Sequence, residues 1–189
     1  MNLHINRPHY RHQKGVTLIE LLVTLSIVTI LLTIAVPSFA EIQQNTRRRS
    51  AVNDYWHAIF LARNEAIKRN SVVSLCKSST GITCDNASGS WSNGWIVFEN
   101  LDRDEPAQRD SNEPILRLYD SSDNISIRSN RTTFTFRPIT QGAVNGTIVF
   151  CDQRGSQSAR AIIISHTGRP RQSNVDASNR PLSCPTQIT

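Results

Sequence analysis

A short arginine-containing segment near the C-terminal end of the chain has residue types that suit the binding of an anion. Gly168 permits a turn and Pro170 stiffens the backbone, so we expect Arg169 and Arg171 to project from an exposed loop. Each guanidinium presents a planar fork of N–H donors and stays charged at any working pH. Two such groups held close together match neighbouring phosphates. The segment therefore predicts an anion-binding site.

The charge of the chain is distributed unevenly. The 189 residues carry a formal net charge of +6. Residues 124 to 189 contain eight arginines and only two acidic residues, whereas residues 84 to 123 hold nine acidic and three basic residues. A basic C-terminal third beside an acidic middle favours an anionic partner that binds at one place.

Other arginines admit two interpretations. Arg154, Arg160 and Arg180 are candidates to extend the basic patch around the turn, and they are equally consistent with ordinary surface arginines. The run from Arg47 to Arg49 is suited to lipid headgroups, to acidic neighbours or to nucleic acid, or it forms a solvated helix face.

Catalytic and metal chemistry find little support in the sequence. It has no Gly-x-Ser-x-Gly, no phosphate-binding P-loop and no His-Glu-x-x-His. It also lacks Cys-x-x-Cys, and His57 and His166 are the only histidines beyond residue 15, which argues against zinc. We therefore expect no catalytic residue, no metal site and no cofactor.

The four cysteines are expected to form disulfides. They all follow the apolar N-terminal segment and so lie on the oxidising side of a membrane. Three pairings are possible. Cys76 with Cys84 and Cys151 with Cys184 is favoured, because the first pair closes a short loop and the second ties back an irregular tail.

The N-terminal region predicts a membrane segment. Leu21 to Val36 contains no charged residue, and with the apolar residues before it the stretch is long enough to cross a bilayer as a helix. The basic residues ahead of it should stay in the cytoplasm and place the rest of the chain outside. A secretory signal peptide is the alternative, but Pro37 spoils the cleavage site, and Glu20 is costly in hydrocarbon.

The segment Lys14-Gly15-Val16-Thr17-Leu18-Ile19-Glu20-Leu21-Leu22 resembles the class III signal of type IV prepilins and type II secretion pseudopilins. The resemblance implies that prepilin peptidase cuts after Gly15 and methylates Val16, where the family usually has Phe. It also implies that Glu20 pairs with the free N-terminal amine of a neighbouring subunit. Other major and minor pilins and the bacterial inner membrane are then the expected partners, with a single membrane pass and a periplasmic C-terminal domain.

Beyond the membrane segment the pattern predicts an α+β fold. One helical face continues outward and carries Val52, Tyr55, Trp56, Ile59, Ala62 and Ala66. β-branched and aromatic runs then predict about seven antiparallel strands packed on that helix, near Val72–Cys76, Trp95–Glu99, Ile115–Tyr119, Ile125–Arg128, Thr132–Phe136, Thr147–Phe150 and Ala161–Ser165. The expected organisation is a leader peptide at 1–15, a transmembrane helix at 16–37, a periplasmic helix at 38–70, a β-sheet domain at 71–165 and a basic tail at 166–189.

Two further segments resemble the GspH/FimT-type minor pilins. The first is Gly94 to Asn100 together with Glu113 to Arg117. Between its two expected strands lie Asn100, Asp102 and Asp104, but Glu105 and Pro106 stand where a calcium loop needs Gly, so we expect an exposed acidic loop.

The second is Gly168-Arg169-Pro170-Arg171, which matches the Gly-Arg-x-Arg motif of FimT-type minor pilins implicated in DNA uptake during natural transformation. The resemblance implies that Arg169 and Arg171 bind double-stranded DNA without sequence preference. Three alternatives stay open: a minor pilin that primes pilus assembly without DNA, a type II secretion pseudopilin, and an anchored periplasmic binding module that is not cleaved at Gly15.

Overall fold

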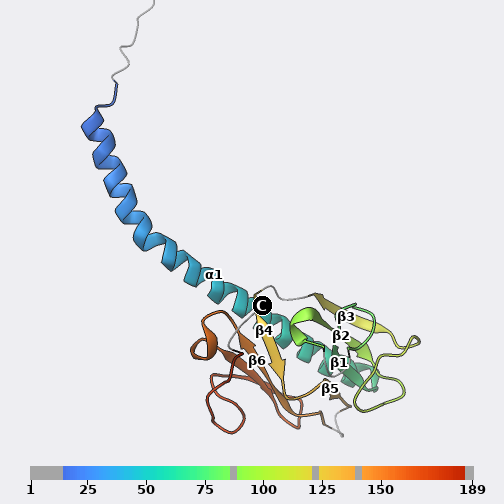
Figure 1. Cartoon of the computed structure of the whole chain (residues 1–189). Coiled ribbons are helices and arrows are strands. Elements are labelled where there is room, and N and C mark those ends of the chain that lie inside the picture. The colour runs from blue at the N-terminus through green and yellow to red at the C-terminus, as the bar shows by residue number, and fades with distance from the viewer. Residues whose placement is uncertain (1–14, 86–88, 121–123, 139–141, 186–189) are drawn as a thin grey trace, which may run out of the picture. The chain divides into compact units, whose positions relative to one another are not determined.

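The computed structural model of the chain describes residues 15–85, 89–120, 124–138 and 142–185. It contains one long helix and eight strands, and the strands form two antiparallel sheets (Figure 1). This confirms the α+β class expected from the sequence. The elements in chain order are α1 (Leu18–Arg69), β1 (Val73–Lys77), β2 (Gly94–Glu99), β3 (Ile115–Asp120), β4 (Ser126–Ser129), β5 (Thr133–Phe136), β6 (Gly146–Cys151), β7 (Arg160–Ile164) and β8 (Pro170–Ser173), with 3-10 turns at Trp91–Asn93 and Gly155–Gln157.

The ends of α1 are explained by local hydrogen bonds. The side chain of Thr17 accepts a hydrogen bond from the backbone N–H of Glu20, which satisfies one of the free donors at the helix start. At the other end Asn70 adopts a left-handed conformation, with φ of 51°. The backbone N–H of Ser71 then reaches back to the carbonyl of Ala66, and the helix stops.

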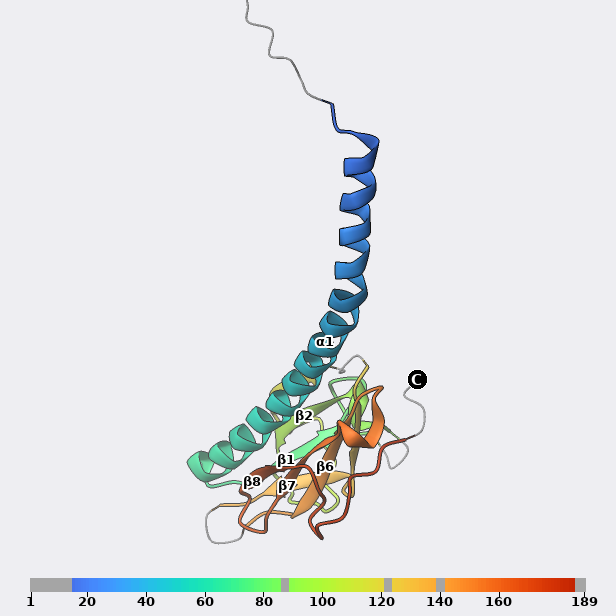
Figure 2. The same ribbon diagram turned by 90° about the vertical axis from the view of Figure 1, so that its left-hand side faces the viewer.

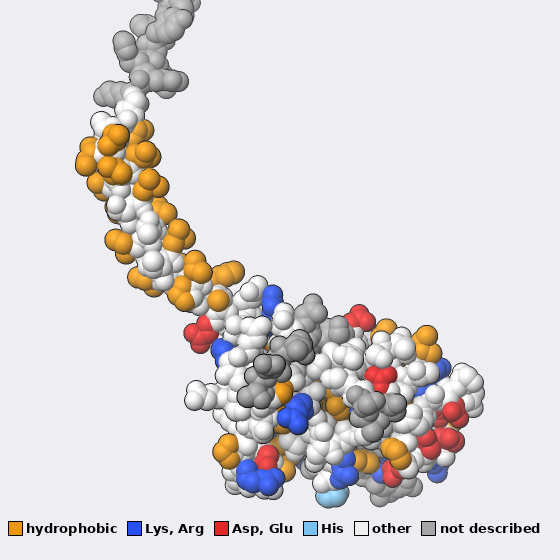
Figure 3. All heavy atoms as spheres, viewed as in Figure 1, with side chains coloured by type: hydrophobic (Ala, Val, Ile, Leu, Met, Phe, Trp, Pro, Cys, Tyr) orange, Lys and Arg blue, Asp and Glu red, His pale blue; other side chains and the backbone are white. Residues whose placement is uncertain are grey.

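The chain divides into two compact units, residues 1–42 and 43–189. In the first, the apolar side chains are exposed from Val16, just before α1, to Ile42 within it, as Figure 3 shows along the helix. Among the described residues α1 is the one helix whose length and composition suffice to cross a membrane. Pro37 lies inside it without ending it.

The second unit contains the hydrophobic core. The described buried hydrophobic residues run from Ala51 to Leu182, so this unit holds the complete core that the structure describes. The expected apolar face of α1 is buried there, apart from Trp56, which is half-buried. Tyr55 lies at the centre, with its ring centroid 4.4 Å from that of Trp95 and 5.6 Å from that of Phe150, so residues from both sheets pack on one side of the helix.

Each sheet has four strands. Their orders are β3-β2-β1-β5 and β4-β6-β7-β8, and all neighbouring strands are antiparallel. Seven strands agree with the sequence prediction to within one or two residues. The eighth, β8, falls inside the segment expected to be a loop-like tail, and it extends the sheet beyond residue 165 (Figure 2). The prediction of about seven strands was therefore one too few.

Candidate functional site

The arginine-containing turn joins β7 to β8. Gly168 has a φ of 73°, a conformation that side-chain-bearing residues rarely adopt. Its N–H donates to the carbonyl of Ser165, and the N–H of Ser165 donates to the carbonyl of Arg169. A Cβ on Gly168 would also lie 3.2 Å from the Cβ of Ala143. Residue 168 must therefore be glycine, both for the backbone conformation of the turn and for its close contact with Ala143. The turn positions Arg169.

Arg171 lies on a strand rather than in the exposed loop expected from the sequence. β8 is the edge strand of its sheet, so Pro170, which has no N–H to donate, is tolerated at its first position. Arg171 pairs with Ile163, whereas Ile162 and Ile164 on either side belong to the main core. Because side chains alternate along a strand, Arg171 points away from that core. This strand was not predicted from the sequence because the residues of β8 are mostly polar.

Arg169 and Arg171 are both exposed. Within the described residues no carboxylate forms an ion pair with either guanidinium. Arg169 immediately precedes β8 and Arg171 is the second residue of that strand, so the two residues lie close together along the hairpin. The hairpin therefore offers two adjacent forks of donors to an anion in solvent.

The structure adds Arg63 to this region, a residue that sequence analysis did not single out. A groove of about 420 Å³ is lined by Phe60, Arg63 and Asn64 of α1 and by Arg169 and Pro170. Arg63 follows buried Ile59 by four residues and so sits at the edge of the apolar helix face. The four-residue spacing from Ile59 to Arg63 can be read from the sequence. Strand β8 beside Arg63 was not predicted, so the sequence did not indicate that Arg63 and Arg169 line one groove.

Arg154 occupies a different place. Its guanidinium donates to both carboxylate oxygens of Asp152 and to Asn45. Asp152 is 2% exposed and also binds Arg48 of α1, with 3.1 Å between Nη1 and Oδ2. Burial opposes ionisation of Asp152, but hydrogen bonds from Arg154 and Ser158 outweigh it and lower its pKa to about 2. The cluster joins helix to sheet, and Arg48 is buried rather than part of a solvated helix face.

The low pKa of Asp152 predicts an acid-sensitive contribution to stability. A carboxyl whose pKa is lower in the folded chain than its ordinary value of 3.8 stabilises the fold above that value. This contribution is lost as the pH falls from about 4 to about 2. The difference in Tm between the wild-type chain and Asp152→Asn should therefore shrink over this interval, measured by circular dichroism. A difference that stays constant from pH 6 to pH 2 would contradict the assigned pKa.

Arg160 and Arg180 lie in separate surroundings. Arg160 is half-buried and donates from Nη1 to the carbonyl of Ala159. Arg180 is exposed, and its Nε lies 2.8 Å from Oδ2 of Asp176. Asp176 thus balances part of the charge of Arg180, and this arginine adds less to the basic patch than its sequence position suggests.

The C-terminal segment after β8 is held by a disulfide. Cys151 of β6 is bonded to Cys184, and Cys76 of β1 to Cys84, which is the pairing that the sequence favoured. Leu182 is buried beside Cys151 in a small apolar cluster. The covalent bond and this cluster together fix the chain that follows the arginine hairpin.

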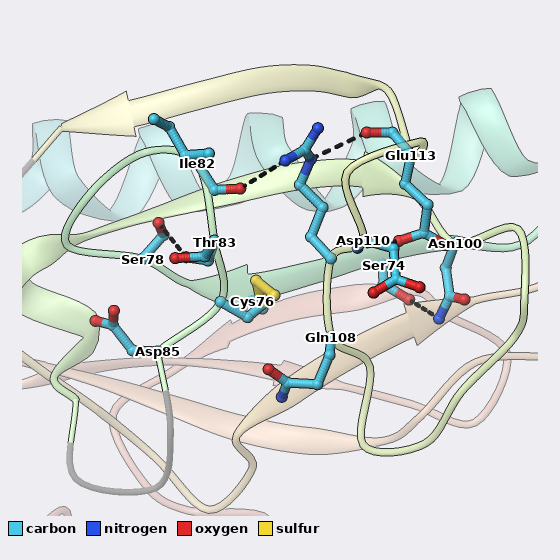
Figure 4. Close-up of a disulfide and its surroundings, with 12 residues drawn as sticks. Ser74, Cys76, Ser78, Ile82, Thr83, Asp85, Asn100, Gln108, Asp110 and Glu113 are labelled. Carbon is cyan, nitrogen blue, oxygen red and sulfur yellow. Dashed lines mark hydrogen bonds between the residues drawn. A yellow bond between two sulfur atoms is a disulfide. The ribbon is translucent and has the colours of Figure 1, made fainter.

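The acidic loop between β2 and β3 is organised by its own side chains. Buried Glu113 accepts hydrogen bonds from the backbone N–H groups of Leu101 and Asp110. The side chain of Asn100 donates to Ser74 (Figure 4). Oδ2 of Asp104 accepts from the N–H of Gln108, and burial raises the pKa of Asp104. The described residues contain no group of three or more His, Cys, Asp or Glu side chains placed to hold a metal ion.

At the N-terminal end the structure describes Gly15, Val16 and Glu20 but not residues 1–14, so most of the expected leader lies outside the described residues. Gly15 is exposed and precedes the start of α1, and Glu20 lies in the first turn of that helix. A backbone that is accessible and not yet helical at Gly15 suits cleavage by a peptidase.

Comparison with known proteins gives two family matches. Residues 51–168 match the family model of the type II transport protein GspH. Residues 10–36 match the model of the prokaryotic N-terminal methylation motif, which includes Gly15, Val16 and Glu20. No curated protein sequence matches the chain.

Solved structures show the same fold. Two crystal structures of the type IV minor pilin FimU from Pseudomonas aeruginosa align with TM-scores of 0.56 and 0.52 at 18% and 19% sequence identity. They cover 76% and 72% of this chain, and 98% of the FimU chain in both cases. At these sequence identities, the structural alignment shows that the folds are alike. Family membership is shown by the match of the sequence to the family model. The chain belongs to the GspH family of pilin-like proteins.

Proposed function

We propose that this chain is a minor type IV pilin that binds double-stranded DNA through the β7–β8 hairpin and aids DNA uptake in natural transformation. One observation carries the proposal. Gly168 holds a tight turn, and exposed Arg169 and Arg171 follow it without a carboxylate partner among the described residues. Such a pair has donors and charge available for neighbouring phosphates.

The physical character of the interaction follows from the residue types. Arginines that contact phosphates bind through charge and hydrogen bonds and do not read base identity. Arg63 and the two hairpin arginines would contact few phosphates, so one subunit should bind weakly and in a salt-dependent manner. Several subunits of a filament would raise the overall affinity by acting together.

The N-terminal motif indicates how this pilin would be processed, anchored and assembled. Prepilin peptidase would cut after Gly15 and methylate Val16, and Glu20 would pair with the N-terminal amine of a neighbouring pilin. The apolar part of α1 fits anchoring in the inner membrane before assembly, with residues 43–189 on the periplasmic side.

The test is the affinity of the full chain, in nonionic detergent, for a fluorescently labelled duplex at several salt concentrations. Replacing Arg169 and Arg171 together by Gln should weaken binding roughly tenfold to hundredfold, because two charge-assisted contacts are lost. The slope of log affinity against log salt should also fall by about 1.8, or about 0.9 for each phosphate contact removed. Fluorescence anisotropy measures both quantities.

The matched control is Arg103→Gln with Arg117→Gln, which removes the same charge from two exposed positions on the other sheet and its loop. This variant should keep nearly the full affinity and slope. Equal losses in the two double variants would show that net charge, not the hairpin, determines binding. No binding by the wild-type chain would favour the minor pilin that primes assembly without DNA.

A type II secretion pseudopilin is the second candidate, and the description of the matching family as a type II transport protein favours it. The two candidates differ in what the cell loses when the gene is deleted. Loss of transformation or piliation supports the pilus assignment, whereas loss of protein secretion with normal pili supports the pseudopilin.

A further inference from the structure

A second basic site lies between α1 and the strands β7 and β8. A pocket of about 360 Å³ is lined by Arg48, Arg49, Val52, Asn53, Arg160 and Gln172. All of these side chains except that of Val52 carry N–H donors, and none of the lining residues is acidic. The composition of the pocket therefore suits an acceptor with several oxygens.

Arg48 lines this pocket as a nearly buried guanidinium. Its side chain is 7% exposed, and its two terminal nitrogens donate to Asp152 and Asn45. Its Nε is buried and has no hydrogen-bond partner. A buried N–H without an acceptor is costly, so Arg48 keeps hydrogen-bonding capacity that Asp152 and Asn45 do not use.

The cluster also carries excess positive charge. Asp152 is shared by Arg48 and Arg154, and among the described residues no carboxylate forms an ion pair with Arg49 or Arg160. Arg48, Arg49 and Arg160 thus line the pocket, while Asp152 is bound to Arg48 and Arg154. Burial lowers the pKa of Arg48, Asp152 opposes this, and the like charges of Arg154 and Arg160 lower the pKa further. An added anion would offset this repulsion.

We propose that this pocket binds a phosphate group. The donors come from the helix and from both strands, and the tetrahedral oxygens of a phosphate can accept hydrogen bonds from several directions at once, whereas the two oxygens of a carboxylate lie in one plane. The phosphate belongs either to free inorganic phosphate or to the backbone of the duplex, and in the second case the inference rests on the proposed function.

The position of the pocket is compatible with the duplex. Arg49 precedes Arg63 by fourteen residues, which is about 21 Å along α1 at 1.5 Å per residue. Arg63 lines the groove next to Arg169. A strand of B-DNA carries a phosphate about every 3.4 Å along its axis, so a single strand can present phosphates to both places.

Inorganic phosphate is the first probe. The Tm of the full chain in nonionic detergent is measured with increasing sodium phosphate, against sodium chloride at the same ionic strength. Phosphate at about ten times its Kd should raise the Tm by roughly 3–6 °C, and the Tm should rise further with the logarithm of the phosphate concentration. Arg49→Gln and Arg160→Gln should each reduce the shift, while Arg117→Gln should keep it. These substitutions leave the Arg48–Asp152–Arg154 contacts in place, so folding is preserved.

The outcomes separate this inference from the proposed function. No shift beyond that of chloride, or an equal shift in Arg160→Gln, overturns the phosphate site. With a shift present, weaker duplex binding by Arg160→Gln identifies the DNA backbone as the source, and unchanged duplex binding identifies free phosphate. A phosphate shift in a wild-type chain that binds no duplex would support the pocket and reject the proposed function.

Discussion

Replacing Asp152 by Asn should lower the free energy of unfolding by about 3–5 kcal/mol, because Arg48 would then be a buried charge without a counter-charge. Asn keeps the size of the side chain, so the loss reports charge rather than packing. Urea unfolding of the full chain in nonionic detergent, followed by tryptophan fluorescence, measures the change.

A second variant tests that interpretation. Replacing Arg48 by Met together with Asp152→Asn removes both buried charges, so the double variant should be more stable than Asp152→Asn alone. Additive losses from the two substitutions would mean that the pair does not couple helix to sheet. Arg154 remains in both variants and reaches solvent more readily than Arg48, so its effect is common to the comparison.

Removal of the Cys151–Cys184 disulfide is expected to be comparably severe. The bond closes a loop of sequence separation 33, and replacing both cysteines by Ala should cost roughly 3.7 kcal/mol on the chain-entropy model. Leu182 should lose its packing when the segment is released. Urea unfolding gives the stability loss, and proteolysis of the C-terminal segment reports its release.

The other disulfide provides the comparison. Cys76 and Cys84 are separated by eight positions, so replacing both by Ala should cost only roughly 2.5 kcal/mol. The C-terminal segment should then stay protected from protease. A larger loss from this pair, or release of the tail by it, would contradict the role assigned to Cys151 and Cys184.

The fold was largely predictable because its signals are local. The three- and four-residue spacing from Val52 to Ala66 predicted the face of α1 that is buried, and β-branched runs predicted seven of the eight strands. β8 was not predicted because Pro170–Ser173 has no apolar pattern. It is a strand because its backbone pairs with β7, and such pairing depends on a neighbour rather than on the segment's own residues.

The candidate site was predictable only in part, for the same reason. Arg169 and Arg171 were identified from a short motif, and Gly168 occupies the left-handed turn that its residue type permits. The roles of the remaining arginines depend on distant partners. Arg154 is bound to Asp152 and Asn45, Arg180 is paired with Asp176, and Arg160 shares a pocket with α1.

By itself, the sequence determined the properties that depend on residue type and spacing along the chain: the N-terminal methylation motif, the apolar segment that follows it, the helix-to-strand order and the favoured disulfides. The tertiary structure decided which charges are available to a ligand. A guanidinium binds an external anion only where no internal carboxylate already holds it, and that depends on residues up to about a hundred positions away, as for Arg48 and Asp152.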